Sequence, residues 1–538
     1  MMASLLEKWS GMWYHQNDNK RRGSRREGRR GDMMKGVARE VERWGVFEWS
    51  CHGPEEGNPF VDQWVRAEFE GAGERVAVEG FYDGSGVYRV RFMPSFEGTY
   101  RYRVSASFDV DEPEGAFTAL PATRGNHGPV RVRDTWHFAY EDGAPYISLG
   151  TTCYAWAMQG DAQIDATLEA LAESPFNKLR FCVFPKHYAY NLDEPQTYPF
   201  EGTPMDSSVL NEENFWDYGP DSAGNAWDFE RFNPAHFRRL ERCIEGLRER
   251  GVEADLILFH PYDRWGFSRM TKEADARYVR YAAARFSAYR NVWWSLANEY
   301  DILKKSPRDW EDIAAVLVEA DPYRHLRSIH NCLHLYDFSR PWVTHCSIQR
   351  THLYLSAELT DAWRERWRKP VVIDEMAYEG DIPYGWGSLT GEEMTRRFWE
   401  TALRGGYPGH GETYLHPSGK LWWSHGGQLR GESPARIAFL AKMLAEVPGG
   451  MLKPYEGRDW DEVCAVPAAR GHEGDMRLYY YSFMRPAYRD FNVPGRWHAT
   501  VIDTWNMTTT DAGVVEGRFR VALGARPWMA VRLVREEP

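Results

Sequence analysis

The segment Asn291-Val-Trp-Trp-Ser-Leu-Ala-Asn298-Glu299 places a carboxylate directly after an uninterrupted apolar run. Such a run, without alternating polar residues, is typical of a strand that is buried on both faces of a parallel sheet. Eight runs of this kind recur, and amphipathic helix patterns such as 236–250 and 274–289 separate several of them. The runs are Tyr146–Thr151, Asn177–Phe184, Asp255–His260, Val292–Ala297, Leu326–His330, Trp342–Ile348, Pro370–Asp374 and Gly411–Leu415. Eight strand–helix units over about 300 residues predict a (β/α)8 TIM barrel.

Shorter runs with alternating polarity lie on both sides of the predicted barrel. On the N-terminal side they are Val65–Phe69, Arg75–Val78, Val87–Phe92 and Gly98–Val104, and on the C-terminal side Met476–Phe483, Trp497–Asp503, Gly517–Leu523 and Met529–Val534. Short alternating strands separated by turn residues predict small β-sandwiches. We therefore expect an α/β fold with a β-sandwich at 38–122, the barrel at 135–447 and a second β-sandwich at 450–538.

Composition narrows the class of protein. The net charge is −12, which argues against nucleic acid as a partner. No apolar stretch approaches the ~18 residues of a membrane span, so we expect no membrane partner. The seven cysteines are odd in number, scattered and without a CxxC pair, which favours free thiols in the cytoplasm over a zinc framework. The 24 tryptophans exceed what core packing alone requires and suit the stacking of sugar rings.

The first 37 residues differ from the rest of the chain. Residues 1–40 carry ten Lys or Arg against five Asp or Glu, with a dense basic block from Lys20 to Arg30. We expect residues 1–37 to be a disordered, solvated leader, or an extension upstream of a start at Met33 or Met34. A basic arm that binds nucleic acid is the alternative.

The ends of two apolar runs carry the predicted chemistry. Glu299 follows the fourth run, and Glu375 follows the seventh, in Lys369-Pro-Val-Val-Ile-Asp374-Glu375. Catalytic residues of TIM barrels lie at the carboxyl ends of the strands, so both side chains should face one cleft. Two carboxyl groups in one cleft are what the cleavage of a glycosidic bond requires. The alternative for each is a capping or pairing role.

Both motifs resemble those of the retaining barrel glycosidases of glycoside hydrolase clan A, in which an Asn-Glu pair ends strand four and the nucleophilic Glu ends strand seven. Segments 405–414 and 421–427 look like the eighth-strand region of bacterial glycosidases related to apiosidases. That group carries an N-terminal immunoglobulin-like domain and a C-terminal β domain, and the resemblance covers residues 40–538. Apiosidases have an Asp where Glu299 stands, so the resemblance does not imply specificity for apiose.

The resemblance also implies roles for individual residues. Glu299 is expected to be the general acid/base, Glu375 the nucleophile, and Asn298 the partner of the sugar's 2-hydroxyl. Arg180 resembles the Arg beside the clan's nucleophile, where its charge would lower the pKa of Glu375. Trp423 matches the clan's sugar-stacking platform. Further candidates for contact with the substrate are Trp156, His187, Tyr188, His260, His330 and Glu412.

These features together predict a retaining glycoside hydrolase without metal or cofactor. We expect it to act from chain ends on plant-type oligosaccharides or glycosides, in the manner of a β-xylosidase or β-glycosidase. No pair of metal ligands follows the first run, where the sequence is Gly150-Thr-Thr-Cys-Tyr-Ala-Trp156. A non-catalytic carbohydrate-binding protein and a transglycosidase are the alternatives, and self-association through the sandwich faces remains open.

Overall fold

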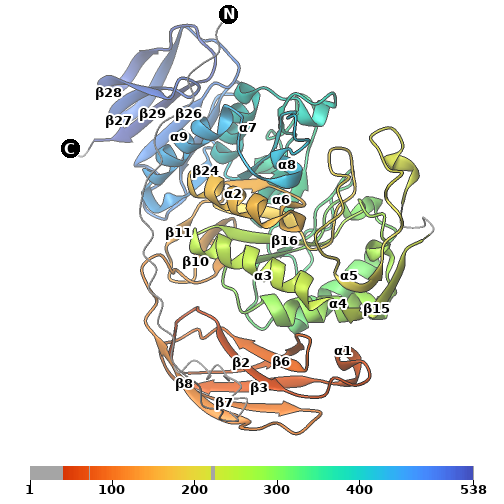
Figure 1. The fold of residues 1–538 in the computed structure, drawn as a ribbon. Coiled ribbons are helices and arrows are strands. Elements are labelled where there is room, and N and C mark those ends of the chain that lie inside the picture. Colours follow the sequence, from red (N-terminus) through yellow and green to blue (C-terminus); the bar gives the residue numbers. More distant parts are fainter. Residues whose placement is uncertain (1–39, 72, 220–223, 537–538) are drawn as a thin grey trace, which may run out of the picture. The chain divides into compact units, whose positions relative to one another are not determined.

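The structure is a computed structural model that describes residues 40–71, 73–219 and 224–536 (Figure 1). The expected leader, residues 1–37, lies outside the described residues. Eight parallel strands form the centre of the described chain, in the ring order β18-β17-β16-β13-β12-β22-β20-β19. They are β12 (Gly150–Thr152), β13 (Lys178–Cys182), β16 (Glu253–Phe259), β17 (Val292–Ala297), β18 (Arg327–Ser328), β19 (Cys346–Gln349), β20 (Val371–Glu375) and β22 (Tyr407–His410).

The ring closes between its two outermost strands. The amide of Thr344 donates to the carbonyl of Arg327 at 2.9 Å, and His330 pairs in parallel with Ser347. The predicted barrel is therefore confirmed. Among the described residues, a helix follows every strand of the ring except β18: α2 (Asp161–Ala172), α3 (Pro234–Glu249), α4 (Lys272–Phe286), α5 (Pro307–Ala320), α6 (Thr360–Trp367), α7 (Gly391–Leu403) and, after a short α8 (Trp422–His425), α9 (Ser433–Ala445).

Three of the eight predicted strands are displaced, and one of them, the sixth, begins at Cys346 rather than at Trp342. The eighth strand is Tyr407–His410, just before the predicted run, whereas β23 (Glu412–Thr413) pairs with β21 (Glu379–Gly380). The sequence Tyr-Pro-Gly-His conceals this strand, but its glycine is required: a Cβ on Gly409 would lie 2.4 Å from the carbonyl oxygen of Asp374. The first strand begins at Gly150, four residues later than predicted.

The start of the first predicted run belongs to a small sheet at the amino end of the barrel. β9 (Val130–Arg133), β10 (His137–Tyr140) and β11 (Pro145–Tyr146) form this antiparallel sheet. Phe138 and Tyr146 pack in one cluster with Trp293, Val372 and Tyr407, which lie near the beginnings of three barrel strands. The small sheet therefore covers the amino end of the barrel.

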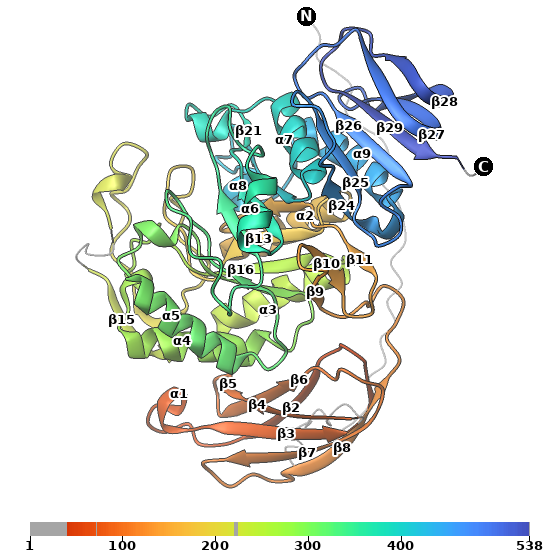
Figure 2. The ribbon, with the colours of Figure 1, turned by 180° about the vertical axis from the view of Figure 1, so that it is seen from behind.

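The N-terminal region consists of two sheets, as expected for a sandwich (Figure 2). One has the order β1-β8-β7-β3-β4 and the other β2-β6-β5. The strands are β1 (Glu40–Glu42), β2 (Phe47–His52), β3 (Val65–Gly71), β4 (Glu74–Glu79), β5 (Phe81–Tyr82), β6 (Val87–Phe92), β7 (Gly98–Ala106) and β8 (Glu114–Leu120), with α1 (Pro59–Asp62) between β2 and β3. Stacked rings join the sheets: Phe47 lies 4.1 Å from Phe117, and Phe69 lies 4.2 Å from Phe92.

Buried charges connect this sandwich to the barrel helices. The Arg91 guanidinium of β6 donates to Glu241 of α3 at 2.7 Å and to the carbonyl of Arg285 at 2.8 Å. Arg285 of α4 also donates to Glu241, at 2.6 Å. Removing one partner of such a network would leave an uncompensated buried charge.

The C-terminal region, expected as a sandwich, is one antiparallel sheet with the order β24-β25-β26-β29-β27-β28. Its strands are β24 (Leu452–Pro454), β25 (Val463–Pro467), β26 (Met476–Tyr480), β27 (Tyr488–Asp503), β28 (Thr508–Ala522) and β29 (Met529–Arg535). Both faces are covered, because Leu478 and Tyr480 belong to the barrel's core cluster whereas Tyr479 packs with Phe491 and Trp497. Successive side chains of residues 478–480 point to opposite faces of the sheet, so this strand packs against the barrel on one face and against the C-terminal core on the other.

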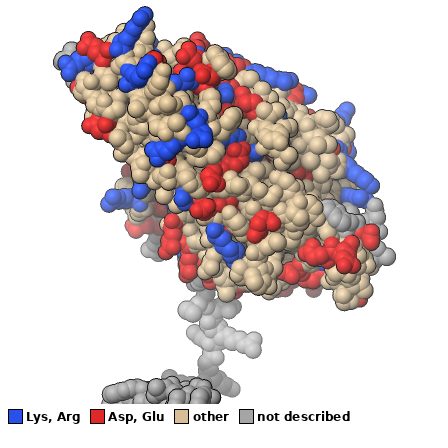
Figure 3. Space-filling model, turned by 90° about the horizontal axis from the view of Figure 1, so that it is seen from above, with Lys and Arg blue, Asp and Glu red and all other residues tan. Residues whose placement is uncertain are grey.

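Two further features concern the surface and the helices. Acidic and basic side chains are interspersed on the face shown in Figure 3, which therefore offers no continuous basic surface there. Among the described residues, no helix is long and apolar enough to cross a lipid bilayer.

Candidate active site

Glu299 and Glu375 line one cavity of about 210 Å³ at the carboxyl end of the barrel. Glu375 is the last residue of β20, and Glu299 follows β17 in a left-handed backbone conformation with φ 51°. All eight strands contribute to this cavity. The lining residues are Tyr154 after β12, Lys186 and Tyr188 after β13, Tyr262 after β16, Asn298 and Glu299 after β17, Cys332 after β18, Gln349 and Thr351 at β19, Glu375, Tyr378 and Trp386 at and after β20, and Trp423 after β22.

Glu299 is prepared to hold a proton near neutral pH. Burial, together with the negative charge of Glu375, raises its pKa to about 7. The Tyr262 hydroxyl donates to one of its carboxyl oxygens and limits this rise. A carboxyl group of this pKa can protonate a leaving group at neutral pH, as a general acid must.

Glu375 lies in a different environment. The Tyr154 hydroxyl donates to its Oε1, and burial together with the charge of Glu375 raises the pKa of that hydroxyl well above its usual value. His330 Nε2 lies 3.9 Å from the same oxygen. Burial, reinforced by Arg180, holds the pKa of His330 well below its usual range, so this ring is neutral. Glu375 therefore faces hydrogen-bond donors and a neutral imidazole.

Arg180 lies in a layer of buried charges beneath the cavity. Its guanidinium donates to Ser295 Oγ at 3.4 Å, and its charge acts on Asp374 and Asp255 more strongly than on Glu375. Lys178 bridges the same two aspartates, at 2.6 Å from Asp374 and 2.9 Å from Asp255. The Arg180 guanidinium therefore interacts with Glu375, but it interacts more strongly with the two aspartates.

Three further predicted residues line the cavity: Asn298, Tyr188 and Trp423. Asn298 Oδ1 accepts a hydrogen bond from the Tyr154 hydroxyl at 3.4 Å. Trp423 lies 5.1 Å from the ring of Trp386, which sequence reasoning did not single out. These rings give the cavity an aromatic wall.

Five of the predicted contact residues are not among the residues that line the cavity: Trp156, His187, His260, His330 and Glu412. Trp156 is fully buried against Phe181 in the core. His187 and His260 are buried, and their Nε2 atoms face the backbone carbonyls of Phe215 and Phe184. Glu412 accepts hydrogen bonds from the amides of Arg430 and Gly431. His330, predicted in the same group, is fully buried but adjoins Glu375, as described above.

Glu412 belongs to a buried group with metal-ligand chemistry. Ligand atoms of Glu379, His410 and Glu412 lie within 4.8 Å of one another. Glu379 accepts hydrogen bonds from the amides of Glu432 at 2.7 Å and Ser433 at 3.1 Å, at the start of α9. Both carboxylates therefore anchor the backbone of 430–433, and this structural role accounts for their burial.

The sequence did not single out eight of the lining residues: Tyr154, Lys186, Tyr262, Cys332, Gln349, Thr351, Tyr378 and Trp386. Each follows or ends a barrel strand, which is the one signal that could have identified them. Tyr154 lies two residues before Trp156, and the turn after β12 directs the tyrosine into the cavity and the tryptophan into the core. Apolar periodicity defines a strand but does not define the direction of the turn that follows it.

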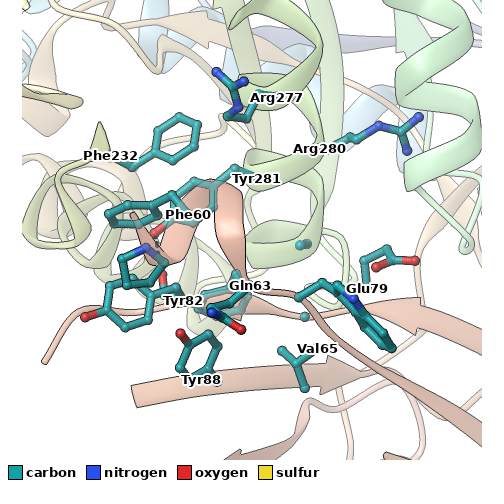
Figure 4. A pocket seen from close by; sticks show the side chains of 15 residues that line it. Phe60, Gln63, Val65, Glu79, Tyr82, Tyr88, Phe232, Arg277, Arg280 and Tyr281 are labelled. Carbon is teal, nitrogen blue, oxygen red and sulfur yellow. Dashed lines mark hydrogen bonds between the residues drawn. The ribbon is translucent and has the colours of Figure 1, made fainter. Parts of the chain in front are cut away.

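A larger hollow, of about 360 Å³, lies between the N-terminal sandwich and α4 (Figure 4). Phe60, Tyr82 and Tyr281 form aromatic walls, and Arg277 and Arg280 lie on α4 at its side. Among the described residues that line it, Glu79 alone carries a carboxylate. This hollow lacks the paired carboxyl groups of the catalytic cavity.

Comparison with known proteins finds three matching families along the chain. Residues 133–472 match the family described as "Apiosidase-like, catalytic domain". Residues 40–107 and 460–534 match the domains of unknown function DUF5060 and DUF5605. No curated protein matches the chain.

Solved structures extend the comparison. A candidate glycoside hydrolase from Bacteroides vulgatus ATCC 8482 is 38% identical, with a TM-score of 0.84 over 92% of this chain and 100% of its own. A glycoside hydrolase family 5 protein from the same organism shares the fold at 15% identity, with a TM-score of 0.57 over 77% of this chain and 95% of its own. The match over 133–472 and the relationship over nearly the whole chain show that this protein belongs to the apiosidase-like family and is a glycoside hydrolase.

Proposed function

We propose that this glycoside hydrolase works with retention of anomeric configuration, with Glu375 as nucleophile and Glu299 as general acid/base. The observation that carries the proposal is the unequal pair of carboxyl groups in one cavity. Glu299 has a pKa raised to about 7, and Glu375 accepts the Tyr154 hydroxyl proton in a hydrogen bond. Two titratable groups whose environments differ in this way are suited to the two roles of a glycosidase.

In the first step, a carboxylate oxygen of Glu375 attacks the anomeric carbon and forms an ester bond to the sugar. The glycosidic C–O bond breaks, and its oxygen takes the proton of Glu299 and leaves as an alcohol. The Tyr154 hydroxyl bonds to Glu375 and to Asn298, and so holds the nucleophile in place.

In the second step, Glu299 is ionised and acts as a base. It takes a proton from water while the water oxygen attacks the anomeric carbon, and the ester bond to Glu375 breaks. The sugar leaves with its original configuration, Glu375 is again a carboxylate, and Glu299 again carries a proton. Tyr262, which donates to Glu299, stabilises the ionised form between the two steps.

The cavity supports action on the ends of short plant-type oligosaccharides, such as β-xylosides. Its volume of about 210 Å³ lies below the range of about 300–1,000 Å³ typical of drug-sized ligand sites. Tyr188, which follows β13, and Trp386, which follows β20, both line it, and their ring centroids lie 6.3 Å apart. A narrow aromatic cavity suits a terminal sugar better than the middle of a polymer.

The stereochemical test uses nitrophenyl glycosides and NMR detection of the first anomer formed. We expect retained product, which requires the two carboxyl groups to lie about 5–5.5 Å apart. Glu375→Ala should abolish turnover, and azide should restore it with product of the opposite anomer. Glu299→Ala should spare substrates with good leaving groups. Inverted product from the wild type would remove Glu375 from the nucleophile role.

A further inference from the structure

Lys186 carries a positive charge into the catalytic cavity. It follows β13, lines the cavity with both carboxyl groups, and is only 3% exposed. Its Nζ lies 3.5 Å from the ring centroid of Tyr154, 4.3 Å from that of Tyr262 and 4.5 Å from that of Trp423. The ammonium is thus enclosed by the faces of three aromatic rings, a favourable place for a cation.

This lysine lacks the partner that a structural buried lysine has. Among the described residues, no carboxylate oxygen lies within 4.0 Å of its Nζ, whereas Lys178 bridges two aspartates and Lys305 pairs with Asp275. An ammonium without a carboxylate partner is costly to bury. Ring faces compensate for only part of that cost, so packing alone does not explain why a lysine occupies this position.

The rings that enclose Lys186 lead directly to the two carboxyl groups. The Tyr154 hydroxyl donates to Glu375, and the Tyr262 hydroxyl donates to Glu299. A cation over a phenol ring strengthens the hydroxyl as a donor, because it stabilises negative charge that develops on the oxygen. One ammonium therefore supports both hydrogen bonds as well as acting directly on both charges.

We propose that Lys186 is the positioning residue that sets the charge of the site: its ammonium, held over the rings of Tyr154 and Tyr262, balances the negative charge that Glu299 and Glu375 share. This inference rests on the proposed double displacement. It assigns to Lys186 the role expected of Arg180, whose charge acts more strongly on Asp374 and Asp255.

The charges around Lys186 agree with this role. Burial lowers its pKa to about 8, and the carboxylates of Glu375 and Glu299 oppose this decrease, so the side chain is a cation at neutral pH. The titratable and charged groups that act on it or face it are Arg180, Cys182, Tyr154, Tyr188, Tyr262, His260, Glu299 and Glu375. Of these, His260 has a pKa lowered to about 3 by burial and adds no charge.

The kinetic test compares Lys186→Met and Lys186→Arg with the wild type on one nitrophenyl glycoside from pH 4 to 10. Loss of the cation should move the alkaline limb of the kcat/KM profile, which Glu299 sets, upward by about one pH unit, since a nearby positive charge lowers the pKa of a carboxyl group by about 1–3. Lys186→Arg should restore the alkaline limb. A Lys186→Met profile that superimposes on the wild type, with a uniform loss of rate, would overturn the inference.

Thermal melting separates this role from a structural one. Lys186→Met should leave Tm unchanged or raise it, because methionine suits an aromatic surrounding and removes the buried charge. Lys305→Met is the matched control: it breaks a buried ion pair outside the cavity, so it should lower Tm and leave the limbs of the profile in place. A fall in Tm for Lys186→Met as large as that of the control would overturn the inference.

A measurement without substrate distinguishes this inference from the proposed function. Lysines carrying ¹³C-methyl groups are titrated by NMR, and the signal absent from Lys186→Arg identifies Lys186. Its midpoint should fall further in Glu375→Gln, because a negative charge that favours the ammonium has been removed. An unchanged midpoint would overturn the coupling of Lys186 to Glu375 whatever the enzyme hydrolyses, whereas inverted product in the stereochemical test would overturn the double displacement.

Discussion

Replacing Glu299 with Gln should change how the stability of the protein depends on pH. In the folded chain the pKa of Glu299 is raised to about 7 from an ordinary value of 4.5, mainly by burial and secondly by Glu375. The folded state therefore binds this proton more tightly than the unfolded state does. The stability that this provides is fully present below pH 4.5 and is lost as the pH rises through 7.

The size of the effect follows from the two pKa values. At about 1.4 kcal/mol per pH unit, a rise from 4.5 to about 7 corresponds to about 3 kcal/mol between pH 4.5 and pH 8. Unfolding entropy of about 2 cal/mol/K per residue converts this, for a barrel of about 300 residues, into about 5 °C of Tm. The glutamine side chain of the Glu299→Gln variant is neutral at every pH, so the variant does not lose this stability.

Differential scanning calorimetry of the wild type and Glu299→Gln between pH 4.5 and pH 8 measures the difference. The two Tm values should be close at pH 4.5, and the wild type should melt about 5 °C below the variant at pH 8. Glu253→Gln is the matched control, since burial raises the pKa of Glu253 to about 8 at a site outside the cavity. That variant should show a similar change in Tm with full hydrolysis. A Tm difference for Glu299→Gln that does not vary with pH would refute the reasoning.

Three further predictions concern the cavity and the barrel. Activity should decline above about pH 7 as Glu299 loses its proton, and a kcat/KM profile with no limb between pH 6 and 8 would contradict its role as acid. Trp423→Ala should raise KM about tenfold, because stacking on the substrate is lost. Trp156→Ala should lower the free energy of unfolding by about 3–5 kcal/mol and leave KM unchanged. Equal effects of the two substitutions on KM would contradict the placement of the two rings. Gly409→Ala should lower Tm and kcat together, because its Cβ would lie 2.4 Å from the carbonyl of Asp374, beside Glu375; wild-type values for both would show that β22 can move away without consequence.

Features that depend on local sequence could be predicted, whereas features that depend on contacts between distant segments could not. Glu299 and Glu375 were predictable because each ends an apolar run, and the carboxyl ends of barrel strands meet at one face. The strand at Tyr407–His410 was misplaced because a proline and a glycine hide its pattern, and the need for Gly409 is visible only when β20 lies beside it.

The side chains between the strands were the least predictable. Trp156 was named as a candidate for contact with the substrate and Tyr154 was not considered, but the backbone after β12 directs Tyr154, and not Trp156, into the cavity. The only local signal at Lys186 was its position after a barrel strand, and lysine is mostly found at surfaces. Its position depends on three rings from three other strand ends, and contacts between distant segments are not contained in any window of sequence.

The small sheet β9–β11 covers the amino end of the barrel, whereas the catalytic cavity lies at the carboxyl end. Phe138 and Tyr146 pack with Trp293 in one buried cluster, so the amino end of the barrel offers the substrate no entry. Substrate and water enter at the carboxyl end of the barrel, and both products leave there. Trp386 and Tyr188 line the cavity at this end. For the proposed action on chain ends, the released sugar has to leave the cavity before the next substrate enters, so we expect the products to inhibit the reaction by competing with the substrate.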